Sequence, residues 1–171
     1  EIHKVEPDTS LLRHVLETAA EDSDYVLVDC PPGIDSTVEN IMEACDELLI
    51  ITMPTQTAGI NAAQIIEKAK QKRQPILGTI INKVSNNPEK ELVEREVEMM
   101  TESDTLAKIP YDEKMKESLF NNTPLLVYDP LAKASLEIRG LAADMEGQMY
   151  EKPKFAKLKR KLRNLKEAIQ R

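Results

Sequence analysis

The sequence predicts an α/β fold in which a parallel sheet carries helices on both faces. Four short apolar runs, at 24–30, 47–52, 77–84 and 105–109, have the length of buried strands. Segments with helical periodicity alternate with these runs, and strands that alternate with helices pair in parallel through right-handed crossovers. The 171 residues suffice for the core of one domain.

The composition is that of a globular protein with reduced thiols. Apolar residues make up 41% and charged residues 31%. No apolar run approaches the roughly 18 residues of a membrane span, and the charged first residues predict no signal peptide. Cys30 and Cys45 form no CxxC pair, which argues against a disulfide framework or a zinc site. The sequence therefore predicts a cytoplasmic protein.

Helix-capping residues and apolar stripes indicate where helices are expected. We expect them at 8–21, 36–45, 55–72, 89–101, 112–120 and 132–149. Ser36 and Glu39 have the spacing of a capping box, and Pro88 suits the first turn of a helix. Residues 125–128 are expected to form a loop or a short edge strand.

The first candidate site follows the first expected strand. Asp29 ends the apolar run Tyr25–Val28, and a Pro-Pro-Gly turn to Gly33 follows. Ligands of open α/β sheets bind at the carboxyl ends of the strands. A carboxylate there can hold Mg²⁺ through water, and the Gly33 amide can approach a phosphate. An ordinary turn after a buried strand is an equally good interpretation. We expect Cys30 to be a buried structural residue and His3 and His14 to lie on the surface.

Three further loops are expected at the same edge of the sheet. The hydroxyls of 52–57 either face a ligand or cap the next helix. The Asn82 amide can both donate and accept, which suits the edge of a purine, although loops often begin with Asn. Pro110, Tyr111 and Asp112 follow the last strand, where they either bracket a base or form a turn in which Asp112 caps a helix.

In this order and spacing the loops resemble the C-terminal two-thirds of the MinD/ParA family of deviant P-loop ATPases. Asp29-Cys30-Pro31-Pro32-Gly33 resembles the family's D-x-P-x-G segment, and Ile81-Asn82-Lys83 resembles its N-[RK] motif. Ile109-Pro110-Tyr111-Asp112 resembles its I-P-x-D loop. The resemblance implies a three-layer P-loop NTPase sandwich that binds ATP and Mg²⁺. Asp29 would orient Mg²⁺, Gly33 would contact the γ-phosphate, and Asn82 with Pro110, Tyr111 and Asp112 would hold adenine.

The printed sequence departs from this family in one essential motif. None of its five glycines begins the K-G-G-x-G-K-[ST] phosphate loop. Backbone amides around the phosphates supply most of the binding energy for ATP. We therefore expect this chain as given neither to bind ATP tightly nor to hydrolyse it. Because it begins at Glu1 without Met, we expect a fragment whose Asp29 strand lacks a neighbour, leaving an edge prone to association. Residues 1–150 would be a partial nucleotide-binding domain.

The pattern of charged and apolar residues at 151–171 predicts a basic amphipathic helix. Residues 152–171 hold nine Lys or Arg and one acid, while the remainder is acidic. The apolar stripe consists of Phe155, Leu158, Leu162, Leu165 and Ile169. Such a helix can lie on an anionic membrane surface. The resemblance to the MinD/ParA family implies a membrane-targeting helix at this place in the chain. The same 3–4 spacing fits a docked helix or a coiled coil. The lack of interleaved aromatic residues argues against nucleic acid.

Several functions therefore stay open. The resemblance implies a spatial regulator of the type that places the cell division site, peripheral on the inner face of the membrane. It would form a homodimer with ATP and recruit regulatory partner proteins. An Mrp-type iron–sulfur carrier ATPase is a second interpretation, although the C-terminal CxxC of that group is lacking. A non-catalytic protein-interaction module of the same fold is the third.

Overall fold

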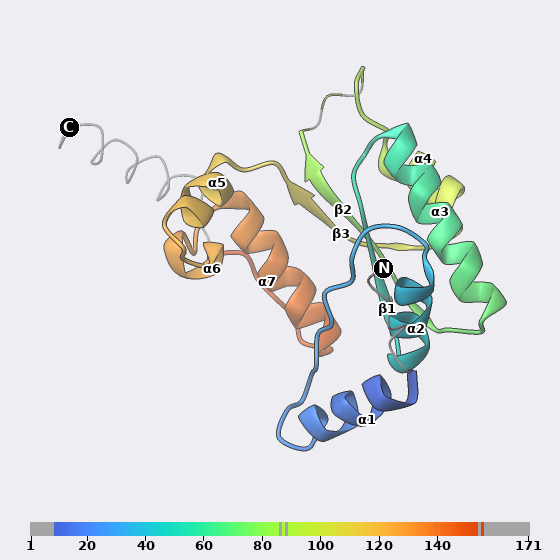
Figure 1. The fold of residues 1–171 in the computed structure, drawn as a ribbon. Coiled ribbons are helices and arrows are strands. Elements are labelled where there is room, and N and C mark those ends of the chain that lie inside the picture. Colours follow the sequence, from blue (N-terminus) through green and yellow to red (C-terminus); the bar gives the residue numbers. More distant parts are fainter. Residues whose placement is uncertain (1–8, 86, 88, 154, 156–171) are drawn as a thin grey trace.

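A computed structural model describes residues 9–85, 87, 89–153 and 155 and places a three-stranded parallel sheet between helices (Figure 1). The strands are β1 (Leu48–Thr52), β2 (Ile76–Val84) and β3 (Thr105–Pro110), paired in the order β1-β2-β3. The helices among the described residues are α1 (Thr9–Ala20), α2 (Ser36–Ala44), α3 (Gln56–Gln71), α4 (Glu94–Thr101), α5 (Glu113–Phe120), α6 (Leu125–Tyr128) and α7 (Lys133–Met145).

The core consists of two apolar layers, one on each face of the sheet. Successive residues of a strand point to opposite faces, so neighbouring residues of β1 enter different clusters. Leu48 and Ile50 pack with Ala62 and Ile66 of α3. Leu49 packs in the cluster on the α7 side, whose buried members are Ile80, Ile109, Leu125, Ala132 and Ala134. The predicted arrangement of a parallel sheet with helices on both faces is confirmed.

The prediction that residues 24–30 form a strand of this sheet is wrong. The segment lies between α1 and α2 as extended chain, and no backbone hydrogen bond pairs it with another described residue. Its apolar side chains are consequently open to solvent, with Leu27 84% exposed and Tyr25 53% exposed. An apolar run can form a strand only where a second strand offers hydrogen bonds, and β1 pairs with β2 alone.

Two expected helix starts are also corrected. Asp35 rather than Ser36 caps α2, because its Oδ1 accepts from the Val38 amide at 3.1 Å. Helix α4 begins at Glu94 instead of 89. The residues before it form a loop closed by Glu91, whose Oε1 accepts from the Ser85 amide at 2.9 Å. The expected cap of α3 is confirmed at Thr55, which accepts from Ala58.

The last two elements differ from expectation for local reasons. Residues 125–128 form the single helical turn α6, in which the Val127 and Tyr128 amides both donate to the Pro124 carbonyl at 2.9 Å. This turn places Leu125 in the core. Helix α7 ends at Met145 instead of 149, because Gly147 takes a positive φ of 64° and its amide turns back to the Asp144 carbonyl.

No helix among the described residues has the length and apolarity needed to cross a membrane. The predicted C-terminal helix falls almost wholly outside the described residues, including Leu158, Leu162, Leu165 and Ile169. Phe155 is described and is 72% exposed.

Candidate functional site

The carboxyl ends of β2 and β3 bring two of the predicted site loops together. Val84 and Pro110 are register partners in neighbouring parallel strands. The Tyr111 amide then donates to the Val84 carbonyl at 2.9 Å, which fixes the loop after β3 against the end of β2. Asn82, two residues before the end of β2, therefore lies on the strand beside Pro110 and Tyr111, as the sequence predicts.

Asn82 has one half of its side-chain amide engaged locally. Its Oδ1 accepts from the Lys83 amide at 2.8 Å, and Lys83 takes a left-handed φ of 59°. The side chain is half-buried. This contact orients the carboxamide, whose N–H₂ group makes no hydrogen bond to another described residue.

Tyr111 and the first turn of α5 form a small polar cluster. The exposed Tyr111 hydroxyl donates to Glu113 Oε1 at 2.6 Å, and Lys116 Nζ lies 5.2 Å from the centre of the Tyr111 ring. The hydrogen bond from Tyr111, with a lesser contribution from Lys116, lowers the pKa of Glu113. One face of the Tyr111 ring is thus occupied by Lys116, so a base that stacks on this ring must use the other face.

Asp112 caps two helices at once. Its Oδ1 accepts from the Lys114 amide of α5 at 3.1 Å. Its Oδ2 accepts from the Lys133 and Ala134 amides of α7 at 2.8 and 3.4 Å. The capping interpretation of Asp112 is therefore confirmed, and the carboxylate holds the loop after β3 against the start of α7.

Asp29 and Gly33 are not joined to this cluster. Both residues are exposed, and no hydrogen bond or ion pair between described residues links them to Asn82 or the loop after β3. Gly33 has a φ of 119°, and a Cβ built on it would meet no atom within 4 Å. A larger residue at this position would therefore meet backbone strain but no steric clash.

Cys30, the histidines and the Thr55 hydroxyl differ from one another in exposure and in hydrogen bonding. Cys30 is exposed rather than buried as expected, because the segment before it is unpaired. Partial burial and the neighbouring Cys45 and Asp29 nevertheless raise the pKa of its thiol, which disfavours a thiolate. His14 is exposed as expected, and His3 lies outside the described residues. Of the loop 52–57, Thr55 is used as the α3 cap.

The donor set fits a magnesium ion only in part. No group of three or more His, Cys, Asp or Glu side chains within the described residues could hold a metal ion. Mg²⁺ in nucleotide sites needs only one or two carboxylates, since phosphate oxygens and waters complete its shell. Asp29 meets this minimum, whereas the described residues offer no run of amides for the phosphates themselves.

A family model matches residues 6–146 of the chain, and its description is ParA, the NUBPL iron-transfer P-loop NTPase. An uncharacterized ATP-binding protein of Methanocaldococcus jannaschii is 27% identical over 82% of this chain and 53% of its own length. The septum site-determining protein MinD of Synechocystis is 25% identical over 80% of this chain and 53% of its own length. The chain thus spans about half the length of these relatives.

Among solved structures, the septum site-determining protein MinD of Pyrococcus horikoshii, complexed with Mg-ADP, superposes with a TM-score of 0.73. It is 23% identical, and the match covers 81% of this chain and 56% of that one. The fold is therefore that of the MinD/ParA P-loop NTPases. With most of its length matched by the family model, the chain belongs to the ParA family of P-loop NTPases.

Proposed function

We propose that this chain forms the adenine-side half of the nucleotide site in a MinD-like ATPase. The observation that carries the proposal is the hydrogen bond of 2.9 Å between the Tyr111 amide and the Val84 carbonyl. It holds Asn82 and the loop Pro110–Asp112 side by side at the carboxyl ends of neighbouring parallel strands, where ligands of such sheets bind.

The roles of the residues follow from their chemistry. The N–H₂ group of Asn82 donates to a ring nitrogen of the base, and backbone groups of the loop Pro110–Asp112 bracket its edge. Asp29 orients Mg²⁺ through water, and the Gly33 amide donates to the terminal phosphate. The phosphate loop that such a site needs is not part of the printed sequence, so tight binding of ATP requires residues that these 171 do not contain.

The base-side half can be tested by itself with adenosine, which has no phosphates. In a ¹H–¹⁵N correlation titration of the full chain, we expect millimolar adenosine to shift the amide signals of Asn82, Lys83 and Tyr111. Asn82→Ala should abolish these shifts, whereas Asn121→Ala, whose side chain donates to the Glu117 carbonyl on α5, should preserve them. Equal shifts with uridine, or none with adenosine, would contradict the assignment of the base site.

The proposal that the chain is part of an ATPase can be tested by sequencing the gene. We expect the genomic DNA upstream of the codon for Glu1 to encode an in-frame phosphate loop roughly 100 codons earlier, as a domain of about 250 residues implies. In the polypeptide that includes this loop, Asp29→Asn should lower Mg-dependent ATP hydrolysis. A stop codon and a start site close to Glu1 would rule out hydrolysis and favour a protein-interaction module.

We further propose a role in spatial regulation, with ATP-driven dimerisation and attachment to anionic membranes through residues 151–171. The name of the Synechocystis relative and the basic amphipathic pattern of this segment support the proposal. Co-sedimentation should be strong with anionic vesicles and weak with neutral ones, and should weaken as salt is raised. Pelleting that does not differ between the two kinds of vesicle would count against it.

An iron–sulfur carrier is the second candidate function, because the matching family model is described as an iron-transfer NTPase. The two cysteines would have to act as ligands, alone or from two copies. Anaerobic reconstitution with iron and sulfide distinguishes the candidates. A visible charge-transfer band that Cys30→Ser removes would support the carrier, and a colourless protein would exclude it.

A further inference from the structure

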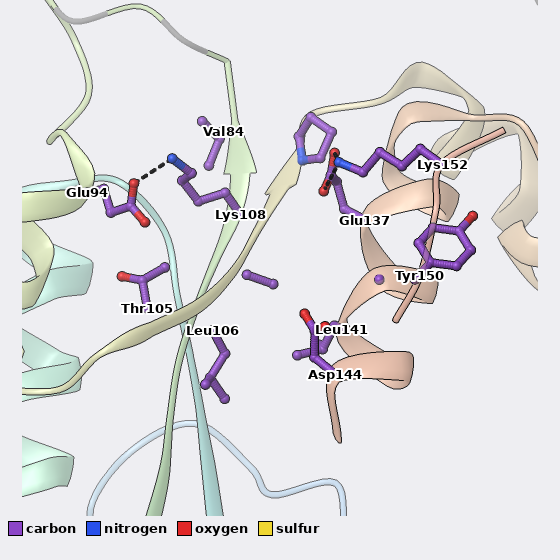
Figure 2. Close-up of a pocket in the computed structure, with 13 residues that line it drawn as sticks. Val84, Glu94, Thr105, Leu106, Lys108, Glu137, Leu141, Asp144, Tyr150 and Lys152 are labelled. Atoms are coloured by element: carbon purple, nitrogen blue, oxygen red, sulfur yellow. Dashed lines mark hydrogen bonds and ion pairs between the residues drawn. The ribbon is translucent and has the colours of Figure 1, made fainter. Parts of the chain in front are cut away.

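The outer edge of β3 lies in a groove that shares only Val84 and Pro110 with the proposed base site. A cavity of about 520 Å³ runs along this edge and is lined by Thr105, Leu106, Ala107, Lys108 and Pro110, which are five of the six residues of β3. Figure 2 shows the strand between two walls, one from α4 with Glu94 and one from α7 with Glu137, Leu141 and Asp144.

This edge has hydrogen-bonding groups that no strand satisfies. On its inner side, the Asp104 carbonyl accepts from the Thr79 amide of β2. The N–H of the same peptide group, that of Thr105, therefore points outward and donates to Glu98 Oε1 of α4 at 3.1 Å. Within the described residues β3 is the last strand of the sheet, so only a side chain covers the start of its edge.

Two buried hydroxyls of the groove also lack partners. Thr105 Oγ1 and Tyr150 OH are buried without a hydrogen bond to any described residue. Buried polar atoms are nearly always paired in native proteins, so an orphan requires an explanation. Both residues line the groove, but their hydroxyl oxygens are closed off from solvent, so a ligand in the groove would reach them only after a side-chain movement.

The charges of the walls favour a cationic ligand. Lys108 is paired with Glu94, and Lys152 is paired with Glu137. Each of these two pairs is electrically neutral. The remaining charged lining residue is Asp144, whose carboxylate makes no ion pair with a described residue. The groove therefore presents one uncompensated negative charge on its α7 wall.

We propose that the β3 edge is a docking site for an extended basic segment of a partner protein, which adds as a strand beside β3. Main-chain hydrogen bonds to an open edge supply affinity in such complexes, and alternate side chains read the two walls. A strand matching the six residues of β3 spans about 20 Å. Side chains on one face of the added strand lie toward α7, where the basic groups meet Asp144 and their aliphatic stems lie along Leu141. The side chains on the other face lie toward α4.

The proposal does not require a bound nucleotide, and it can be tested with a defined peptide on the full chain. The probe is the capped hexapeptide of alternating Lys and Val. Hydrogen–deuterium exchange of the amides of residues 105–109 should slow when it binds. The corresponding Glu–Val hexapeptide, and a Lys–Val version with both inner valines replaced by proline, should give no such protection. If the Glu–Val peptide gives no protection but the proline-containing Lys–Val peptide still protects β3, charge attraction explains the binding. That result would overturn strand addition.

Two variants with equal changes of net charge locate the site. Asp144→Lys should weaken binding of the Lys–Val probe about fivefold, as expected for a solvent-exposed charge pair. Glu151→Lys, at an exposed residue that does not line the groove, is the matched control and should weaken binding much less. Thermal melting by circular dichroism verifies that both variants fold. Equal weakening by the two substitutions would overturn the site.

The chain's own basic C-terminal segment is the competing occupant. Amide exchange of residues 105–109 in the full chain should be the same as in a chain ending at residue 153. Faster exchange in the shortened chain would mean that the segment itself covers β3, and would overturn the assignment to a partner.

Discussion

At the scale of single residues, Asp112 determines how the loop after β3 is held. One carboxylate accepts hydrogen bonds from the first turns of both α5 and α7. These helix starts also favour a negative charge through the helix dipole. In the proposed base site, Asp112 thus positions the loop, and the neighbouring backbone groups contact adenine.

We predict that Asp112→Ala lowers the free energy of unfolding by about 2 kcal/mol, since it removes the caps of two helices. Urea titration followed by circular dichroism measures the change. Asp35→Ala, which removes the single cap of α2, is the control and should cost about 1 kcal/mol. A loss at Asp112 no greater than the loss at Asp35 would mean that the double cap has no additional effect.

A second residue-scale prediction concerns acid. Hydrogen bonds and ion pairs from Lys68 and Lys72 of α3 lower the pKa of Glu39 on α2 below its ordinary 4.5. Because the folded-state pKa is the lower one, this stabilisation is complete above pH 4.5 and is lost as the pH falls through the folded-state value. Glu39→Gln should therefore flatten the dependence of stability on pH below 4.5, measured by urea titration at several pH values. An unchanged slope would contradict the pairing.

At the scale of elements, Gly78 permits β2 and β3 to pair closely. It has a φ of 152°, and a Cβ at this position would lie 2.6 Å from Leu106 Cγ and 3.0 Å from the Asp104 carbonyl oxygen. A larger residue would thus meet both backbone strain and a steric clash in the middle of the sheet.

We predict that Gly78→Ala destabilises the fold by about 3 kcal/mol, combining left-handed strain with overpacking. Gly147→Ala is the control, because Gly147 has a φ of 64° and a Cβ built on it would meet no atom within 4 Å. It should cost about 1 kcal/mol, which represents the backbone strain alone. Urea titrations of both variants separate the two contributions. Equal losses would show that the contact with Leu106 relaxes at no cost.

The elements that the sequence predicts correctly are those whose partners follow next along the chain. The runs at 47–52, 77–84 and 105–109 become β1, β2 and β3, because consecutive strands pair with each other and a single helix connects each pair. The run at 24–30 is no less apolar, yet it has no partner among the described residues. Residues 125–128 are misassigned for another reason, since the preceding Pro124 accepts two amides and begins a helical turn.

The part of the candidate site at the ends of β2 and β3 could also be predicted from the sequence. Asn82 and the loop Pro110–Asp112 meet because parallel strands end at one edge, which the pattern of strands and helices implies. The groove along β3 could not be predicted. Its walls come from residues about 50 positions apart in the sequence, Glu94 and Asp144, and neither lies in a motif with a recognisable spacing.

At the scale of the whole molecule, exposed apolar side chains occur on β1 and on the segment 25–30, as they also do on α5 and α6. Ile51 of β1 is 64% exposed, and the unpaired segment 25–30 exposes Leu27 by 84%. Open strand edges and exposed apolar runs favour pairing with other chains. Because β1 combines exposed apolar side chains with an open strand edge, we expect the chain as given to self-associate through β1 and the segment 25–30.

We predict that Leu27→Lys shifts the chain toward monomer in sedimentation velocity, while the free energy of unfolding changes by less than about 0.5 kcal/mol. Leu119→Lys is the matched control, because Leu119 is 69% exposed on α5, away from β1. It should leave the association unchanged. An equal shift in both variants would show that association is driven by general hydrophobicity and does not involve this edge.

The order of the strands in the sheet has a consequence for how the molecule folds. Because β1, β2 and β3 are neighbours both along the chain and in the sheet, each βαβ unit closes a loop of modest length. Such a topology has a low contact order for a parallel sheet, and low contact order favours fast folding. The sheet can also grow strand by strand while the chain leaves the ribosome, with each new strand finding its partner already in place.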